Sequence, residues 1–210
     1  MLNDVEVRAL GSLIEKESTT PEYYPLSLNA LTNACNQTSN RQPVVHFDEA
    51  AVSRAADTLR EKNLVRMVDR GDTRVRKYRH IMNETLSLDT PEMAVMYVLM
   101  VRGPQTVGEI RTRCNRVYDF KSLGDVESVL DTLIAKQPAL AARLPRQTGQ
   151  KEVRYAHLLS GEVSFHEPDA AQPAAQNDDR LARLEERTIE LQNEVDDLRK
   201  QLDQFRKQFE

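Results

Sequence analysis

Basic side chains that could bind phosphate are concentrated between residues 60 and 80. Eight lysines and arginines stand there against three acidic residues, although the formal net charge of the 210-residue chain is −4. The eight are Arg60, Lys62, Arg66, Arg70, Arg74, Arg76, Lys77 and Arg79. Because such groups neutralise phosphates without reading base sequence, this cluster predicts contact with a nucleic-acid backbone. A solvated charged surface without a partner is the alternative interpretation.

A second candidate for phosphate binding is the polar segment 36–41, which contains amide, hydroxyl and guanidinium groups and no acidic residue. Groups of this kind can bind a phosphate or a base edge. They equally suit a loop whose Asn and Ser side chains satisfy its own backbone. Asn40 and Arg41 are the candidate contacts in this segment. The remaining candidate contacts are Arg54, Lys151 and Arg154.

The sequence contains no pattern typical of catalysis or metal binding. The four histidines lie far apart, and none stands beside a cysteine or serine in a motif of known mechanism. Cys35 and Cys114 occupy matching apolar positions, which favours small buried side chains over reactive thiols. Two cysteines exclude a disulfide scaffold, and the seven glycines form no phosphate-binding loop. We therefore expect a protein without enzymatic activity, metal or cofactor.

The first third of the chain predicts three helices followed by a hairpin. Asp4, Ser27 and Asp48 are placed to cap the three helices. Two strand-like runs follow at 64–68 and 75–78, with a Gly-Asp turn between them. This order of elements is typical of a winged helix-turn-helix domain.

The same order of elements recurs in the second third of the chain. Four residues of the second helix repeat at a constant offset of 79: Leu28, Leu31, Cys35 and Asn36 return as Val107, Ile110, Cys114 and Asn115. Thr90 is placed to cap the first helix of this copy, with Pro91 as its first residue, and Thr106 to cap the second. The repeat predicts two winged-helix domains, at 1–82 and 86–162, in a mainly α fold with small β wings (α+β).

The last part of the chain predicts a linker and a coiled coil. Residues 163–178 are rich in Pro, Ala, Gln and Asp, as flexible linkers are. From 179 to 210, apolar residues alternate in steps of three and four, which predicts a homodimer through this C-terminal helix. The predicted contact residues are Leu181, Leu184, Leu191, Val195, Leu198, Leu202 and Phe205. The alternative is a single amphipathic helix folded back onto the domains.

Several short strings resemble those of the YceH-type family, a bacterial family of uncharacterised function. They are Thr19-Thr20-Pro21-Glu22, Tyr24-Pro25-Leu26-Ser27, Ala34-Cys35-Asn36-Gln37, Asn40-Arg41-Gln42-Pro43-Val44 and Arg102-Gly103-Pro104-Gln105-Thr106. The resemblance covers almost the whole chain, including its acidic helical tail. It implies a tandem winged-helix fold and brings no known activity with it.

Two functions fit such a fold. The first is binding of duplex DNA or another nucleic acid, in which a dimer presents four winged helices so that weak contacts reinforce one another. The second is a protein-binding adaptor, favoured because the third helices, over 48–62 and 121–136, each carry a net charge of −1. Phosphate binding weakens steeply with salt, whereas docking through apolar faces does not, which separates the two.

The sequence also predicts where the protein works. Its longest apolar stretch, Met93 to Val101, is about half a membrane span. Residues 1–4 lack the basic and apolar regions of a signal peptide. We therefore expect a cytoplasmic protein that does not associate with membranes.

Overall fold

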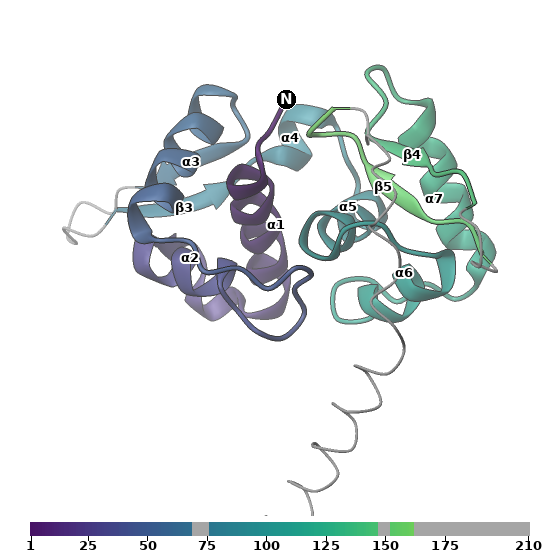
Figure 1. Cartoon of the computed structure of the whole chain (residues 1–210), viewed down its shortest axis with the longest axis horizontal. Helices are drawn as coiled ribbons and strands as arrows, with labels where there is room; N and C mark the ends of the chain where they lie inside the picture. The colour runs from purple at the N-terminus through teal and green to yellow at the C-terminus, as the bar shows by residue number, and fades with distance from the viewer. Residues whose placement is uncertain (69–75, 147–151, 162–210) are drawn as a thin grey trace, which may run out of the picture. The chain divides into compact units, whose positions relative to one another are not determined.

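The structure of the protein is a computed structural model, which describes residues 1–68, 76–146 and 152–161. These residues form a mixed α+β fold with seven α-helices and two small antiparallel sheets (Figure 1). The helices are α1 (Asp4–Thr19), α2 (Leu28–Cys35), α3 (Glu49–Glu61), α4 (Met82–Leu86), α5 (Thr90–Arg102), α6 (Val107–Cys114) and α7 (Leu123–Ala135). The strands are β1 (Leu26–Ser27), β2 (Val65–Val68), β3 (Lys77–His80), β4 (Ala141–Arg143) and β5 (Tyr155–His157), and η1 (Pro21–Tyr23) is a short 3-10 helix.

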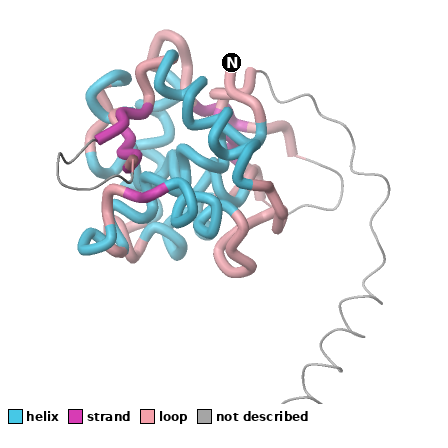
Figure 2. Tube along the Cα trace, turned by 90° about the vertical axis from the view of Figure 1, so that its left-hand side faces the viewer, coloured by secondary structure: helices cyan, strands magenta, loops and turns pink. Residues whose placement is uncertain are grey.

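The elements follow the same order in both halves of this fold. In the first half α1, α2 and α3 precede the pair β2–β3, and in the second half α5, α6 and α7 precede the pair β4–β5. Figure 2 shows that helices make up most of the fold and that the strands are short. Strand β1 adds to the first sheet, where Leu26 pairs with Tyr78. Gln105, 79 residues after Leu26, bridges Tyr155 in the same way, through backbone hydrogen bonds of 3.0 and 2.8 Å. The two halves therefore share both element order and strand pairing.

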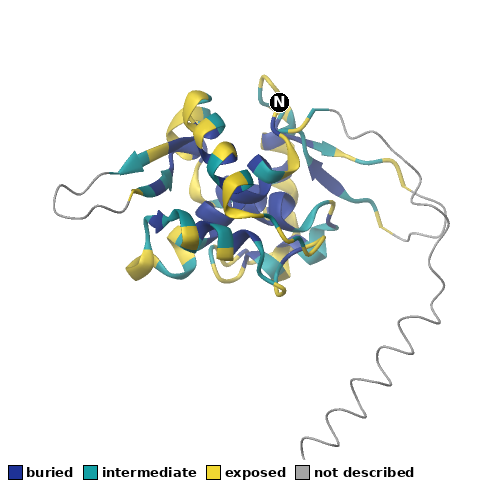
Figure 3. Cartoon of the chain, turned by 60° about the vertical axis from the view of Figure 1, so that its left-hand side comes forward, coloured by how far each residue is buried: buried dark blue, intermediate teal, exposed yellow. Residues whose placement is uncertain are grey.

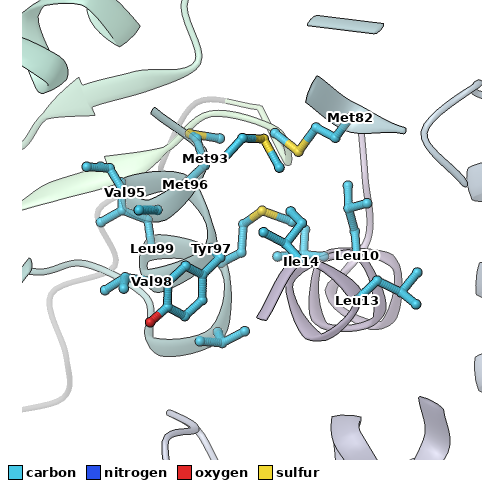
Figure 4. Close-up of a cluster of buried hydrophobic side chains, with 14 of the residues drawn as sticks. Leu10, Leu13, Ile14, Met82, Met93, Val95, Met96, Tyr97, Val98 and Leu99 are labelled. Atoms are coloured by element: carbon cyan, nitrogen blue, oxygen red, sulfur yellow. The ribbon is translucent and has the colours of Figure 1, made fainter. Parts of the chain in front are cut away.

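Helices α1 and α5 form the centre of the fold and pack against each other. Every residue from Glu6 to Glu15 in α1 and from Glu92 to Val101 in α5 is buried (Figure 3). Their contact is apolar, and Figure 4 shows Leu10 and Ile14 of α1 in one cluster with Met96 of α5. Since each half supplies one of these helices, the two halves share one continuous hydrophobic core.

Gly11 allows α1 and α5 to approach each other closely. A Cβ atom at this position would lie 2.9 Å from Cγ1 of Val101 and 3.0 Å from Cβ of Met100. Real Cβ atoms do not come this close to their neighbours, so a side chain at position 11 would push the helices apart.

Three predicted helix caps are confirmed. The side chains of Ser27, Asp48 and Thr106 each accept a hydrogen bond from the backbone N–H three residues later, at the start of α2, α3 and α6. Thr106 also makes the reciprocal bond, in which its backbone N–H donates to the carboxylate of Glu109. The cap and its partners lie within one helical turn, so sequence spacing alone identifies them.

Two other predicted caps are wrong by one residue. Asn3, not Asp4, caps α1, and Asp89, not Thr90, caps α5. In both cases the cap forms a reciprocal capping box with a glutamate three residues later, a pairing that the neighbouring Asp4 and Thr90 do not make.

The second strand begins later than predicted, and one helix was not predicted. Strand β3 begins at Lys77, the first residue that pairs with both β1 and β2. It continues to His80, whose backbone N–H donates to the hydroxyl of Tyr24. Helix α4 occupies the predicted boundary between the domains. It spans only five residues, too few for an apolar period to appear in the sequence.

Candidate nucleic-acid interface

Three cations lie on one face of the first sheet. Strands β2 and β3 pair antiparallel, with Arg66 opposite Arg79 and Val68 opposite Lys77. Directly opposite residues, and residues two apart on one strand, share a face. Arg66, Lys77 and Arg79 therefore lie on the same side, here called the cationic sheet face. On the other side, Val65, Tyr78 and His80 are buried in the core, and Met67 is partly buried.

One carboxylate partly neutralises this face. Glu84 of α4 lies 3.1 Å from Nη2 of Arg79 and 3.9 Å from Nη1 of Arg66. The Arg66 side chain is still 60% exposed, and Arg76, just before β3, is also exposed. Among the described residues, neither Arg76 nor Lys77 has an acidic partner within ion-pair distance. The face therefore retains an excess of positive charge that solvent can reach.

The third helices add little positive charge. On α3, Arg54 is exposed as predicted, but Arg60 pairs with Asp57 at 2.8 Å and Glu49 and Glu61 are exposed as well. On α7 the exposed ionisable residues are Asp125, Glu127 and Asp131. Hydrogen bonds from the Ser122 side chain and backbone lower the pKa of Asp125, so it stays negatively charged at neutral pH.

Arg41 is buried inside the fold, which disfavours its predicted role as a contact for phosphate. Its guanidinium is completely buried and lies 2.6 Å from a carboxylate oxygen of Glu15 in α1. It also donates to the backbone oxygen of Ala34 at 2.8 Å and to the side-chain oxygen of Gln37 at 3.1 Å. A buried charge is stable only when it is paired and hydrogen-bonded in this way. Arg41 therefore connects the α2–α3 loop to α1.

Two further predicted contacts are already engaged within the fold. The Asn40 side chain accepts a hydrogen bond from the guanidinium of Arg102. Arg154 donates to Oε2 of Glu109 and to the carbonyl of Pro104, both at 2.9 Å. Arg154 is therefore neutralised and only partly exposed, so it adds little accessible positive charge to the second half.

The other predicted contacts lie outside the described residues. They are Arg70, Arg74 and Lys151, together with the predicted dimer contacts Leu181, Leu184, Leu191, Val195, Leu198, Leu202 and Phe205. Arg79, which belongs to the predicted basic cluster, does lie on the cationic sheet face. Its alternation with the buried Tyr78 along the strand places it on this outer side.

Comparison with known proteins decides which family this sequence represents. Residues 2–150 match the family described as "Protein of unknown function, DUF480". The chain belongs to the DUF480 family. A UPF0502 protein of Geotalea daltonii is 54% identical over 191 residues, which cover 88% of this chain and 87% of the relative. The assignment to a bacterial family of uncharacterised function is thereby confirmed.

Other relatives match the DUF480 chain over a similar length. A UPF0502 protein of Opitutus terrae is 51% identical over 189 residues, covering 89% of this chain and 81% of the relative. A UPF0502 protein of Solibacter usitatus is 50% identical over 188 residues, covering 88% and 90%. None of these three names states an enzymatic activity.

The cysteines and His157 of the DUF480 chain are in environments that disfavour reactivity. Burial raises the pKa of the Cys35 thiol to about 11 and that of Cys114 to about 12, so neither forms a thiolate at neutral pH. Burial also lowers the pKa of His157 to about 4. Over the described ranges, no three His, Cys, Asp or Glu side chains are grouped to hold a metal ion. Nor does any helix there have the length and apolar character needed to cross a bilayer.

Proposed function

We propose that this DUF480 protein is a tandem winged-helix protein that binds nucleic acid through its phosphates, without a catalytic step, in the cytoplasm. The observation that carries the proposal is the cationic sheet face, where Arg66, Lys77 and Arg79 lie together and, among the described residues, only Glu84 pairs with them. Phosphate contacts need exposed cations on a protruding surface, and a short hairpin of this kind supplies them.

The repeated order of elements supports the winged-helix part of the proposal. Each half has three helices followed by two antiparallel strands, with a further short pairing that precedes its second helix. Proteins of this architecture place a helix and a hairpin against nucleic acid. Since α3 and α7 carry little positive charge, we assign the contact to the first hairpin and expect low sequence preference.

Binding of a random duplex is expected to depend steeply on salt. Contact with about four phosphates predicts a slope near −3.6 for log Kobs against log salt concentration. Fluorescence anisotropy of a labelled duplex with the full chain, repeated at several salt concentrations, measures this slope. Salt-independent binding, or no binding at about 50 mM salt, contradicts the proposal.

A protein-binding role is the second candidate, and the surface of α7 favours it. Leu123 is 49% exposed at the start of this helix, next to the exposed acidic residues Asp125 and Glu127. Leu123 also shares a hollow with Val107 and Val153. Exposed apolar side chains of this kind suit a protein surface better than phosphate. If duplex binding fails the salt test, capture of protein partners on the intact chain and on Leu123→Lys becomes the informative experiment.

The dimer forms the last part of the proposal and has its own test. Removing residues 179–210 deletes the whole heptad pattern, which includes Leu181 and Phe205. We expect the molar mass in solution to fall from that of two chains to that of one, because the apolar seam supplies the association energy. Light scattering coupled to size exclusion measures it. An intact chain that already has the mass of a single chain contradicts the dimer.

A further inference from the structure

A small cavity lies where the two halves of the fold meet. Its volume is about 220 Å³, and its walls come from α1, the α2–α3 loop, α5 and α6 with the residues that follow it. The side chains that matter here are Glu15, Asn40, Tyr97, Arg102, Arg113 and Arg116. None of them belongs to the cationic sheet face, so an inference about this cavity does not rest on the nucleic-acid proposal.

The cavity is strongly positive. Three arginines line it, and the carboxylate of Glu15 is already paired with the buried Arg41. Nη2 of Arg113 lies 3.6 Å from a carboxylate oxygen of Glu109. Glu109 is not among the residues that line the cavity. Burial, and then the positive charge of Arg113, lower the pKa of Arg102. Three guanidinium groups facing one small space repel each other, and an anion placed between them would remove that repulsion.

Two of the arginines that line the cavity are not fully engaged within the described part of the protein. Nη1 of Arg113 is buried and makes no hydrogen bond within the described part of the protein. Arg116 is exposed at the rim and, among the residues that the structure describes, forms no ion pair. A buried donor of this kind is costly unless a partner satisfies it.

The wall that carries these donors is held in place. The Tyr97 hydroxyl donates to the carbonyl of Arg113 at 2.8 Å, and Figure 4 shows this hydroxyl pointing away from the apolar cluster. Arg102 is held by its hydrogen bond to the side chain of Asn40. The site is therefore preorganised from both halves of the chain, which reduces the entropy that binding would cost.

We propose that this cavity binds the phosphoryl group of a small phosphorylated molecule, between Arg102, Arg113 and Arg116. Guanidinium groups match the geometry of phosphate oxygens and bind them in pairs of parallel hydrogen bonds. A wider hollow of about 430 Å³ shares Asn40 and Arg116 with the cavity and adds Lys16 and Ser39, which leaves room for the rest of the molecule. Because both halves supply donors, the ligand also links them.

A phosphate on a nucleic-acid backbone has the same chemistry but fits this site less well. Arg102 and Arg113 are only partly exposed and lie in a concave site between helices, whereas duplex phosphates lie on a convex surface. Of these three arginines, only Arg116 is exposed. The geometry therefore favours a small molecule that can enter the cavity.

Isothermal titration calorimetry of the full chain with inorganic phosphate, at constant ionic strength, tests the proposal. We expect saturable binding of one phosphate per chain, weakened at least about tenfold in Arg113→Gln with Arg116→Gln, as loss of a charge-assisted hydrogen bond predicts. Arg54→Gln with Arg60→Gln makes the same change of net charge on α3 and should leave the affinity unchanged. Arg116→Gln alone serves if the double variant fails to fold, because Arg116 is exposed.

Three results would overturn the proposal. One is the absence of saturable phosphate binding, and another is equal affinity in the cavity variant and the α3 control. The third result distinguishes a small phosphorylated molecule from a nucleic-acid backbone as the ligand. It needs a parallel binding experiment with a duplex. If a duplex binds to the full chain, if Arg113→Gln with Arg116→Gln removes that binding, and if free phosphate does not compete, then the cavity arginines serve nucleic acid.

Discussion

Replacing Arg66 and Lys77 by glutamate is expected to weaken duplex binding at least about 100-fold at low salt. Each change removes a cation that neutralises a phosphate and adds a repulsive charge, and two such changes together amount to about 3 kcal/mol. The two residues share the cationic sheet face, so a phosphate backbone crossing that face meets both. The salt slope should also become shallower by about two, because two phosphates are then no longer neutralised by the protein.

The fold should tolerate this variant. Arg66 is largely exposed and Lys77 is partly exposed, and substitutions at such positions change stability by about 0.5 kcal/mol or less. Anisotropy with the same labelled duplex measures the loss of affinity, and a thermal unfolding curve verifies that the variant is folded. Any large loss of affinity then reports on the contact surface.

A charge-matched variant in the second half provides the control. Lys121→Glu with Arg143→Glu changes the net charge by the same amount at two exposed positions away from the first sheet. We expect this variant to weaken duplex binding by less than about tenfold, because it changes only the overall electrostatic potential of the protein. Equal losses of affinity in the two variants would mean that net charge, and not the cationic sheet face, determines the affinity.

The elements that the sequence predicts best are those determined by neighbouring residues. Ser27, Asp48 and Thr106 cap helices as expected, because a cap and its partner N–H lie within one turn. The errors at Asn3 and Asp89 have the same local origin, since a better capping box was available one residue earlier. Such errors shift a boundary and leave the order of elements unchanged.

The candidate site was harder to predict because exposure depends on distant partners. Arg41 lies in a loop segment without acidic residues, and its partner Glu15 lies 26 residues earlier, in helix α1. Arg154 is likewise neutralised by Glu109, 45 residues earlier. From the local composition both arginines are expected to be unpaired. They are paired because the fold places Glu15 of α1 beside Arg41 and Glu109 of α6 beside Arg154.

The arginines of the cavity illustrate the same limit. Arg102 belongs to the first helix of the second half, while Arg113 and Arg116 belong to the next helix and the residues after it. They line one cavity with Glu15 and Asn40 only because α1 packs against α5. The sequence repeat predicts the helices and strands of each half, but it does not predict how the two halves pack against each other.

Replacing Arg41 by methionine is expected to destabilise the protein by about 3–5 kcal/mol. The change leaves the Glu15 carboxylate, which is nearly buried, without its cation, and removing one partner of a buried pair carries this cost. The carbonyl of Ala34 and the side chain of Gln37 lose their donor as well. Chemical denaturation followed by circular dichroism measures the free energy of unfolding.

Two further variants show whether burial of the pair is the cause. Arg60→Met breaks an ion pair with Asp57 on the exposed side of α3, and we expect a loss of stability below about 1 kcal/mol. Adding Glu15→Gln to Arg41→Met should restore part of the lost stability, because the unpaired buried charge is then gone. One outcome would contradict this interpretation: Arg41→Met lowers the free energy of unfolding no more than Arg60→Met does, and it weakens duplex binding instead. Arg41 would then be a binding residue that is exposed in the protein in solution.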